Sequence, residues 1–174
     1  MIEIRMADVR RRVLITTERV KFTEADPYGH LASGAYVNMI MSHRVEALQD
    51  RLGFSIVRLA GSGVAFPARS MTITYLRPTY VGEVLELGSW IEEMDDSRFE
   101  LRVIVSDATD RTARAVATIE FVTVDTRTGK RIATPETLPS SAKSDPLADL
   151  PRSEEYVAGI LGLPDGWMSF LPAL

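Results

Sequence analysis

The sequence predicts an α+β domain in which one long helix lies across an antiparallel sheet. A run rich in β-branched residues at positions 13–22 reads as a first strand. Apolar residues then follow helical spacing up to Leu52, and from Val64 the spacing changes to period two, with turn residues between the runs. This order of elements predicts a single sheet with one helix covering a face.

The segment 34–52 predicts an amphipathic helix, with Ser33 as N-cap and Gly53 as the residue that ends it. The expected apolar stripe consists of Val37, Met41, Val45, Leu48 and Leu52, flanked by Tyr36, Ile40 and Ala47. Arg44 and Arg51 project into this stripe. An arginine there must reach solvent past the rim of the core or pair with an anion. For Arg44 we predict a carboxylate partner near the sheet rim.

Four further strands are predicted at residues 64–77, 83–94, 98–107 and 113–124. Pro67 indicates an irregularity in the first of them, because proline cannot donate a ladder hydrogen bond. Gly129 is expected to have positive φ in the turn that follows the last. Residues 54–63 fit either a short strand or a helical extension.

The two ends of the chain differ from this core. Residues 1–12 read as a flexible lead-in or a short helical turn, and Arg10–Arg12 as solvated surface or contacts to the phosphates of a nucleotide-bearing thioester. We place a domain at 1–135 (core 13–135), followed by a linker and C-terminal helical tail at 136–174. A helix at 152–163 and the apolar groups beyond it are expected to dock on this domain or on a neighbouring subunit. The apolar residues concerned are Tyr156, Val157, Ile160, Leu161, Trp167, Phe170 and Leu171.

Composition excludes several classes of function. The chain has 174 residues and a formal net charge of −4, so it has a single-domain size and no electrostatic footprint for nucleic acid. No apolar run approaches the ~20 residues that span a bilayer. The first residues lack the pattern of a secretory signal, so we expect a cytoplasmic protein. With no cysteine and two histidines, neither disulfides nor a structural zinc site is expected.

Residues 22–34 are the chemically informative stretch. Asp26-Pro27 begins a turn, Gly29 and Gly34 permit unusual backbone geometry or close approach, and the loop leads into a helix N-terminus. Free N–H groups and the helix dipole at such an end favour negative charge, including charge that develops during a reaction. Asp26 is therefore a candidate base or nucleophile; alternatively, it only holds the turn.

Asp26, Gly29 and His30, followed by Tyr36, Asn38 and Arg44, resemble the acyl-CoA thioesterases of the hot-dog fold, nearest to the group that contains 4-hydroxybenzoyl-CoA thioesterase. The resemblance covers about residues 13–135. It implies an antiparallel sheet wrapped around one long central helix. The sequence departs from the pattern at Ala32, where many relatives have Asn, and at Met41, where many have an acidic residue.

The resemblance implies hydrolysis of an acyl-CoA or acyl-carrier-protein thioester, with no cofactor and no metal beyond the coenzyme A of the substrate. It assigns Asp26 as general base or nucleophile, His30 as a hydrogen-bond donor, and the Ser33 and Gly34 N–H groups as the oxyanion hole. Gly29 and Tyr36 are expected at the substrate. Relatives form dimers, often dimers of dimers, so a homodimer or homotetramer with the pocket at the subunit boundary is expected.

Alternatives remain at two levels. Glu24 is the rival carboxylate, since it alternates with Asp26 if the strand continues, and His43 is expected to be structural. The rival functions are a hot-dog dehydratase or hydratase, which pairs a histidine with a helix carboxylate, and a non-catalytic acyl-thioester binding protein. The Asp26–His30 loop fits the dehydratase pattern less well. No Gly-x-Ser-x-Gly motif supports a serine triad.

Overall fold

The computed structural model, which describes residues 2–142 and 147–161, contains a five-stranded antiparallel sheet. Its strands follow the order β2-β5-β6-β7-β4. Their bounds are β2 (Leu14–Arg19), β5 (Val84–Met94), β6 (Arg98–Asp107), β7 (Ala113–Val122) and β4 (Ala68–Tyr75). The strands predicted at 83–94, 98–107 and 113–124 are confirmed. β4 begins after Pro67, and its pairing with β7 is irregular between Ala68 and Ser70, as that proline indicated.

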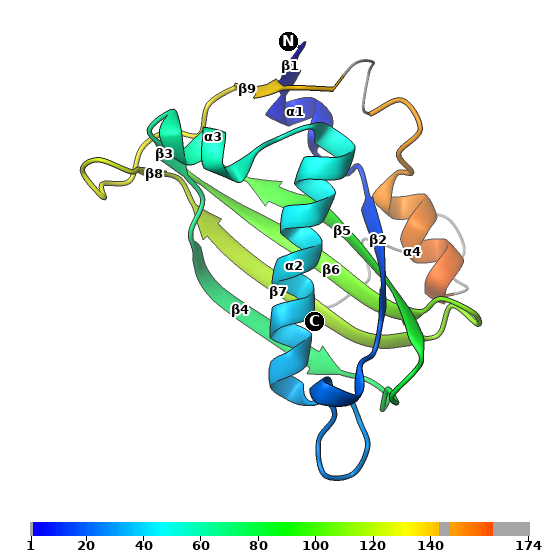
Figure 1. Ribbon diagram of the computed structural model, residues 1–174. Helices are drawn as coiled ribbons and strands as arrows, with labels where there is room; N and C mark the ends of the chain where they lie inside the picture. Colours follow the sequence, from blue (N-terminus) through cyan, green and yellow to red (C-terminus); the bar gives the residue numbers. More distant parts are fainter. Residues whose placement is uncertain (1, 143–146, 162–174) are drawn as a thin grey trace.

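The long helix α2 (Ser33–Leu52) lies across one face of this sheet (Figure 1). Residues that alternate along β5, such as Leu85 and Leu87, join the α2 side chains in the main core. This arrangement of a sheet around a central helix is the hot-dog fold. None of the helices that the structure describes combines the length and the apolar character needed to cross a bilayer.

Short elements complete the described chain. They are β1 (Ile2–Arg5), α1 (Met6–Val9), the 3₁₀ helix η1 (Phe22–Glu24), α3 (Ile56–Gly61), β3 (Val64–Ala65), β8 (Val124–Asp125), β9 (Thr137–Ser140) and α4 (Ser153–Leu161). The ambiguous residues 54–63 thus form a helix, with Ser55 accepting a hydrogen bond from the Arg58 N–H at its N-terminus. Gly129 has a φ of 66° in its turn, as predicted.

The buried face of α2 differs from the predicted stripe. Val37 and Val45 are 39% and 36% exposed, so the prediction that they face the core is wrong. The buried side chains are Tyr36, Met39, Ile40, His43, Ala47 and Leu52. A polar residue explains the difference: the His43 ring is fully buried between the Thr16 hydroxyl at 2.7 Å and the Ser89 hydroxyl at 2.7 Å. Hydropathy alone assigns His43 to the polar side of α2. The predicted apolar stripe is therefore rotated about the helix axis relative to the face that is buried.

The buried His43 makes stability depend on pH. Burial lowers its pKa to about 4 from an ordinary 6.5. Between these values the unfolded chain binds a proton that the folded chain does not, so stability is lost as the pH falls from 6.5 toward 4. At most, about 3 kcal/mol is lost through this group. We expect His43→Gln to reduce the pH dependence of the urea midpoint between pH 7 and 4.5. Equal pH dependence in the two proteins would refute this assignment.

Both ends of the chain are more structured than predicted. β1 pairs with β9 in antiparallel register, and Met6 and Val9 of α1 are buried, so residues 2–9 are not a flexible lead-in. The alternative prediction, a short helical turn, is confirmed at α1. The predicted linker is wrong at residues 137–140, because they form that strand, and the Ser141 N–H donates to the Gly53 carbonyl at 3.1 Å. The division of the chain at residue 135 stays a prediction.

Helix α4 covers the other face of the sheet, where its buried Tyr156, Val157 and Ile160 pack against Trp90 and Ile104. The docking of this part of the predicted tail is thereby confirmed, whereas Trp167, Phe170 and Leu171 lie outside the described residues. The Tyr156 hydroxyl donates to a Glu86 carboxylate oxygen at 3.0 Å. Gly88 makes this approach possible, since a Cβ there would lie 2.3 Å from the Tyr156 ring.

We therefore expect Gly88→Ala to displace α4 and to lower the free energy of unfolding by about 1–3 kcal/mol, the usual cost of overpacking. Limited proteolysis should show faster cleavage at the start of α4. Gly61→Ala is the matched control, because a Cβ there meets nothing within 4 Å. Equal protection of α4 in Gly88→Ala and in the wild type would contradict the packing argument.

Candidate active site

A tight turn shapes the loop that contains Asp26. The Gly29 N–H donates to the Asp26 carbonyl at 3.0 Å, with Pro27 at the second position of the turn. Gly29 has a φ of 78°, which a residue with a Cβ rarely adopts. This turn requirement explains Gly29; its predicted contact with substrate stays a prediction.

The loop returns to its own start before the helix begins. The Asp26 N–H donates to the His30 carbonyl at 2.7 Å, and the Ala32 N–H donates to the Glu24 carbonyl at 2.9 Å. Ala25 and Leu31 pair as an antiparallel bridge. Asp26 is therefore held close to the residues that open α2, at the end of the helix remote from α1 and α3 (Figure 1).

The Asp26 carboxylate both holds the turn and keeps one oxygen available. Its Oδ1 accepts the Tyr28 N–H at 2.8 Å and the His30 N–H at 3.0 Å. Among the residues that the structure describes, none donates to Oδ2. The half-buried side chain is thus oriented by its own loop, as a positioned base or nucleophile must be.

Glu24 is less well placed than its spacing predicted. The first strand ends at Arg19, and Glu24 lies in η1, so the strand alternation that would align it with Asp26 does not exist. Its Oε2 accepts the Lys21 N–H at 2.8 Å and closes the start of that short helix. Glu24 has a local structural role.

His30 contacts Asp26 through its backbone, not through its ring. The half-buried imidazole packs edge-on against Tyr80, with 5.0 Å between ring centroids. In the described part of the chain, no group hydrogen-bonds either ring nitrogen. The ring is therefore not paired with a carboxylate in this part of the chain, and its predicted hydrogen bond to the substrate stays a prediction.

The start of α2 leaves two backbone donors unused. Ala32, not Ser33, is the N-cap, and it provides no side-chain hydrogen bond, so the predicted cap is wrong. The Ala35 and Tyr36 N–H groups donate to the Ala32 carbonyl. Within residues 2–142 and 147–161, the exposed Ser33 and Gly34 have no acceptor for their N–H groups. An uncapped first turn with free donors is suited to bind an anion.

Tyr36 supports the loop from inside. It is 3% exposed, and its hydroxyl lies 2.8 Å from the Thr79 hydroxyl. The Thr79 carbonyl accepts the Leu31 N–H at 2.7 Å, which ties the loop to the turn between β4 and β5. Burial raises the pKa of the Tyr36 phenol. The predicted core position of Tyr36 is confirmed, whereas its contact with substrate stays a prediction.

The turn between β4 and β5 is a part of the site that sequence reasoning missed. The Arg114 guanidinium donates to the Pro78 carbonyl at 3.1 Å and pairs with Asp107 at 3.0 Å. This network fixes Thr79 and hence the Asp26 loop. The sequence signal for this segment is the pair Pro78 and Gly82, residue types that are typical of a turn between two strands.

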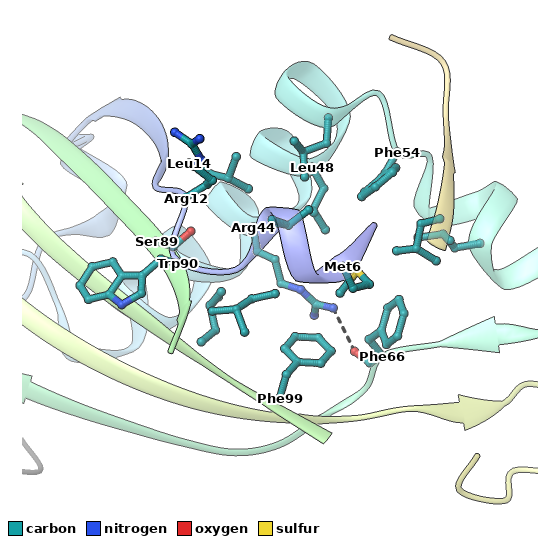
Figure 2. Close-up of a pocket in the computed structure, with 16 residues that line it drawn as sticks. Met6, Arg12, Leu14, Arg44, Leu48, Phe54, Phe66, Ser89, Trp90 and Phe99 are labelled. Atoms are coloured by element: carbon teal, nitrogen blue, oxygen red, sulfur yellow. Dashed lines mark hydrogen bonds between the residues drawn. The ribbon is translucent and has the colours of Figure 1, made fainter. Parts of the chain in front are cut away.

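A separate apolar cavity lies near the other end of α2 (Figure 2). Arg44 and Leu48 line it, and Asp26 does not. The Arg44 guanidinium donates to the Phe66 carbonyl at 3.1 Å and stacks 3.8 Å from the Phe121 ring centroid. The predicted carboxylate partner is wrong for the described residues, because a ring face and a carbonyl take its place. Among those same residues, no group of three or more side chains is arranged to hold a metal ion.

Comparison with known proteins places this geometry in a family. The model of the thioesterase-like superfamily matches residues 20–142, which include the whole Asp26 loop, α2 and the strands β4, β5, β6 and β7 of the main sheet. The chain belongs to the thioesterase-like superfamily. The recognised resemblance to hot-dog thioesterases is confirmed at this level.

Individual relatives are distant in sequence. The chain is 23% identical over 118 residues to the long-chain acyl-CoA thioesterase FadM of Escherichia coli K12, covering 68% of this chain and 88% of that protein. A 1,4-dihydroxy-2-naphthoyl-CoA thioesterase from Synechocystis superimposes with a TM-score of 0.65 at 18% identity, over 71% and 90% of the two chains. A Staphylococcus aureus protein solved in complex with CoA superimposes with a TM-score of 0.66 at 16% sequence identity. The match covers 80% of this chain and 94% of that protein. These structural likenesses support the fold.

Proposed function

We propose that this member of the superfamily hydrolyses an acyl thioester, with Asp26 as general base or nucleophile. One observation carries the proposal: within the described part of the chain, a carboxylate with one oxygen free of donors is fixed beside a helix N-terminus whose first two N–H groups lack acceptors. Thioester hydrolysis needs both parts, because an oxygen must attack the carbonyl carbon while the carbonyl oxygen gains charge.

In the general-base form, Asp26 takes a proton from a water molecule while the oxygen of that water bonds to the carbonyl carbon. The resulting oxyanion accepts hydrogen bonds from the Ser33 and Gly34 N–H groups. The C–S bond then breaks, and the thiolate leaves and takes up a proton. In the nucleophile form, Asp26 attacks the carbonyl carbon directly, the C–S bond breaks, and the thiolate leaves and takes up a proton. Water then hydrolyses the resulting anhydride, which releases the acid and restores the Asp26 carboxylate. In this proposal neither form needs a metal or another cofactor.

The substrate class follows from chemistry and from relatives. FadM is a long-chain acyl-CoA thioesterase, and the Staphylococcus aureus relative was solved with CoA, which supports an acyl-CoA substrate. An acyl-carrier-protein thioester presents the same reacting group. The dehydratase alternative is less well supported, because it pairs a histidine with a helix carboxylate and the His30 ring has no carboxylate partner among the described residues.

A free-thiol release assay tests the proposal. The protein is mixed with short-chain, long-chain and aromatic acyl-CoA compounds and with an acyl-carrier-protein, and thiol is detected with a chromogenic disulfide. We expect enzyme-dependent release for at least one acyl class, with kcat above 1 s⁻¹ for a good substrate, the lower end of the usual ~1–10³ s⁻¹. Binding of acyl-CoA without thiol release would favour the non-catalytic alternative.

We further propose that the protein is a homodimer or homotetramer with the pocket at the subunit boundary. Strand β4 is an edge of the sheet, and its unpaired side is a template for another strand. At the end of this strand, Tyr75 and the following Leu76 are 47% and 46% exposed. Light scattering at micromolar concentration is expected to give at least twice the mass of 19.3 kDa. A monomer under these conditions would contradict the assembly.

A further inference from the structure

A mainly polar recess lies between α1 and the residues that lead into α4, away from the Asp26 loop (Figure 1). Its volume of about 380 Å³ falls within the ~300–1,000 Å³ of small-molecule sites. Three arginines line it: Arg10, Arg12 and Arg152. The single carboxylate among its described lining residues is Asp8, which Arg5 holds by two hydrogen bonds, at 2.8 and 3.2 Å. The recess therefore carries an excess of positive charge.

The backbone places two of these arginines directly opposite each other. Arg12 and Arg152 form an antiparallel bridge outside the main sheet. The backbone hydrogen bonds flank this pair and do not join it, since they come from the Val13 and Ser153 N–H groups. Side chains of such a pair lie closer together than those of a hydrogen-bonded pair, with Cα atoms about 4.5 Å apart. Like charges placed directly opposite each other are destabilising, so an anion between them would stabilise this part of the fold.

In the run Arg10–Arg12, the middle arginine is paired with a carboxylate and the outer two are not. Arg11 has a φ of 61°, which a residue with a long side chain rarely adopts, and its guanidinium pairs with Glu154 at 3.1 Å. Arg10 and Arg12 donate instead to backbone carbonyl groups, at 3.3 and 2.8 Å. These bonds orient the two guanidinium groups without neutralising them. In the described part of the chain, no carboxylate pairs with either of them or with Arg152.

Phosphate groups match this arrangement of charge. A guanidinium can donate two parallel hydrogen bonds to a phosphate, and each phosphate brings about −1.5 to −2 charges. One phosphate would leave part of the charge of three arginines unbalanced, whereas two linked phosphates balance it. We propose that the recess is a binding site for a diphosphate group, held by Arg10, Arg12 and Arg152. Free pyrophosphate and a nucleotide both carry this group, and the proposal does not depend on thioester hydrolysis.

Titration calorimetry with inorganic pyrophosphate at low ionic strength tests the site, with sulfate as a smaller divalent anion and ADP as a nucleotide that carries the same group. We expect the wild type to bind pyrophosphate at least about tenfold more tightly than sulfate, because pyrophosphate pairs with more of the guanidinium groups. Arg152→Gln should weaken pyrophosphate binding about tenfold, the loss of one hydrogen bond to a charged group. Arg127→Gln is the matched control, since it removes an exposed arginine that does not line the recess, and it should bind as the wild type does.

A second pair of variants separates charge from folding. Ala148 is an exposed lining residue, so Ala148→Glu adds a carboxylate to the recess and leaves every arginine in place. It should abolish pyrophosphate binding, whereas Ala148→Gln, which has the same size, should retain it. ADP that binds as tightly as pyrophosphate, and is weakened by Arg152→Gln, would assign the site to a nucleotide, and weaker binding of ADP would assign it to free pyrophosphate. No binding of pyrophosphate, equal binding of sulfate, or unchanged binding by Arg152→Gln or Ala148→Glu would each overturn the proposal.

Discussion

Asp26→Asn is expected to lower turnover of the best thioester about 10²–10⁴-fold, the range for losing a positioned acid–base group. The amide retains an oxygen that can accept the Tyr28 and His30 N–H groups at 2.8 and 3.0 Å. The turn should therefore persist, and the thermal midpoint should change little. What is lost is the negative charge of the carboxylate, whose Oδ2 has no donor among the described residues.

Asp26→Ala separates chemistry from turn formation. It removes the acceptor as well as the charge, and two lost hydrogen bonds cost about 1–2 kcal/mol of stability. If Asp26 only held the turn, Asp26→Asn would be as active as the wild type and Asp26→Ala would lose activity in proportion to its stability. Glu24→Gln is the carboxylate control, and its turnover should stay within about twofold of the wild type, since Glu24 caps η1.

Ser33→Pro is expected to lower turnover about 10²–10³-fold, the usual loss for one oxyanion donor. The substitution deletes the N–H of the first residue of α2 and nothing that the fold uses. Proline is favoured at this first helical position, and Ala32 before it is extended, with φ −62° and ψ 145°, as a residue preceding proline prefers. The free energy of unfolding should therefore stay constant or rise slightly.

Ser33→Ala is its matched control, because it removes the hydroxyl and keeps the N–H. We expect Ser33→Ala to retain near wild-type turnover. If Ser33→Pro folds normally and hydrolyses as fast as Ser33→Ala, the first N–H group of α2 does not stabilise the oxyanion. A loss of activity in both variants would assign the role to the hydroxyl instead.

The sequence predicted the sheet well because period-two spacing and turn residues are local signals. Strand β6 has the predicted bounds, and Pro67 and Gly129 mark the irregularity and the turn that they indicated. The orientation of α2 was harder to predict. His43 is buried because two hydroxyls from distant strands meet its ring, and no local pattern shows those partners.

The candidate site could be predicted only where it depends on local sequence signals. Asp26 and Gly29 form a local turn that the residue types specify. The support from Thr79 and Arg114 arises from contacts between residues more than thirty positions apart. The Arg44 environment was mispredicted likewise, because sequence reasoning weighed carboxylates and did not anticipate the Phe121 ring face.

Single-turnover measurement with Asp26→Asn tests the central claim most directly, because excess enzyme isolates the chemical step from product release. The best acyl-CoA from the thiol-release panel is mixed with wild-type or variant protein, and free CoA is followed after rapid quenching. We predict that the rate constant of the variant falls about 10²–10⁴-fold while its dissociation constant for the thioester stays within about threefold. A folded variant that releases CoA at the wild-type rate would contradict the role of Asp26.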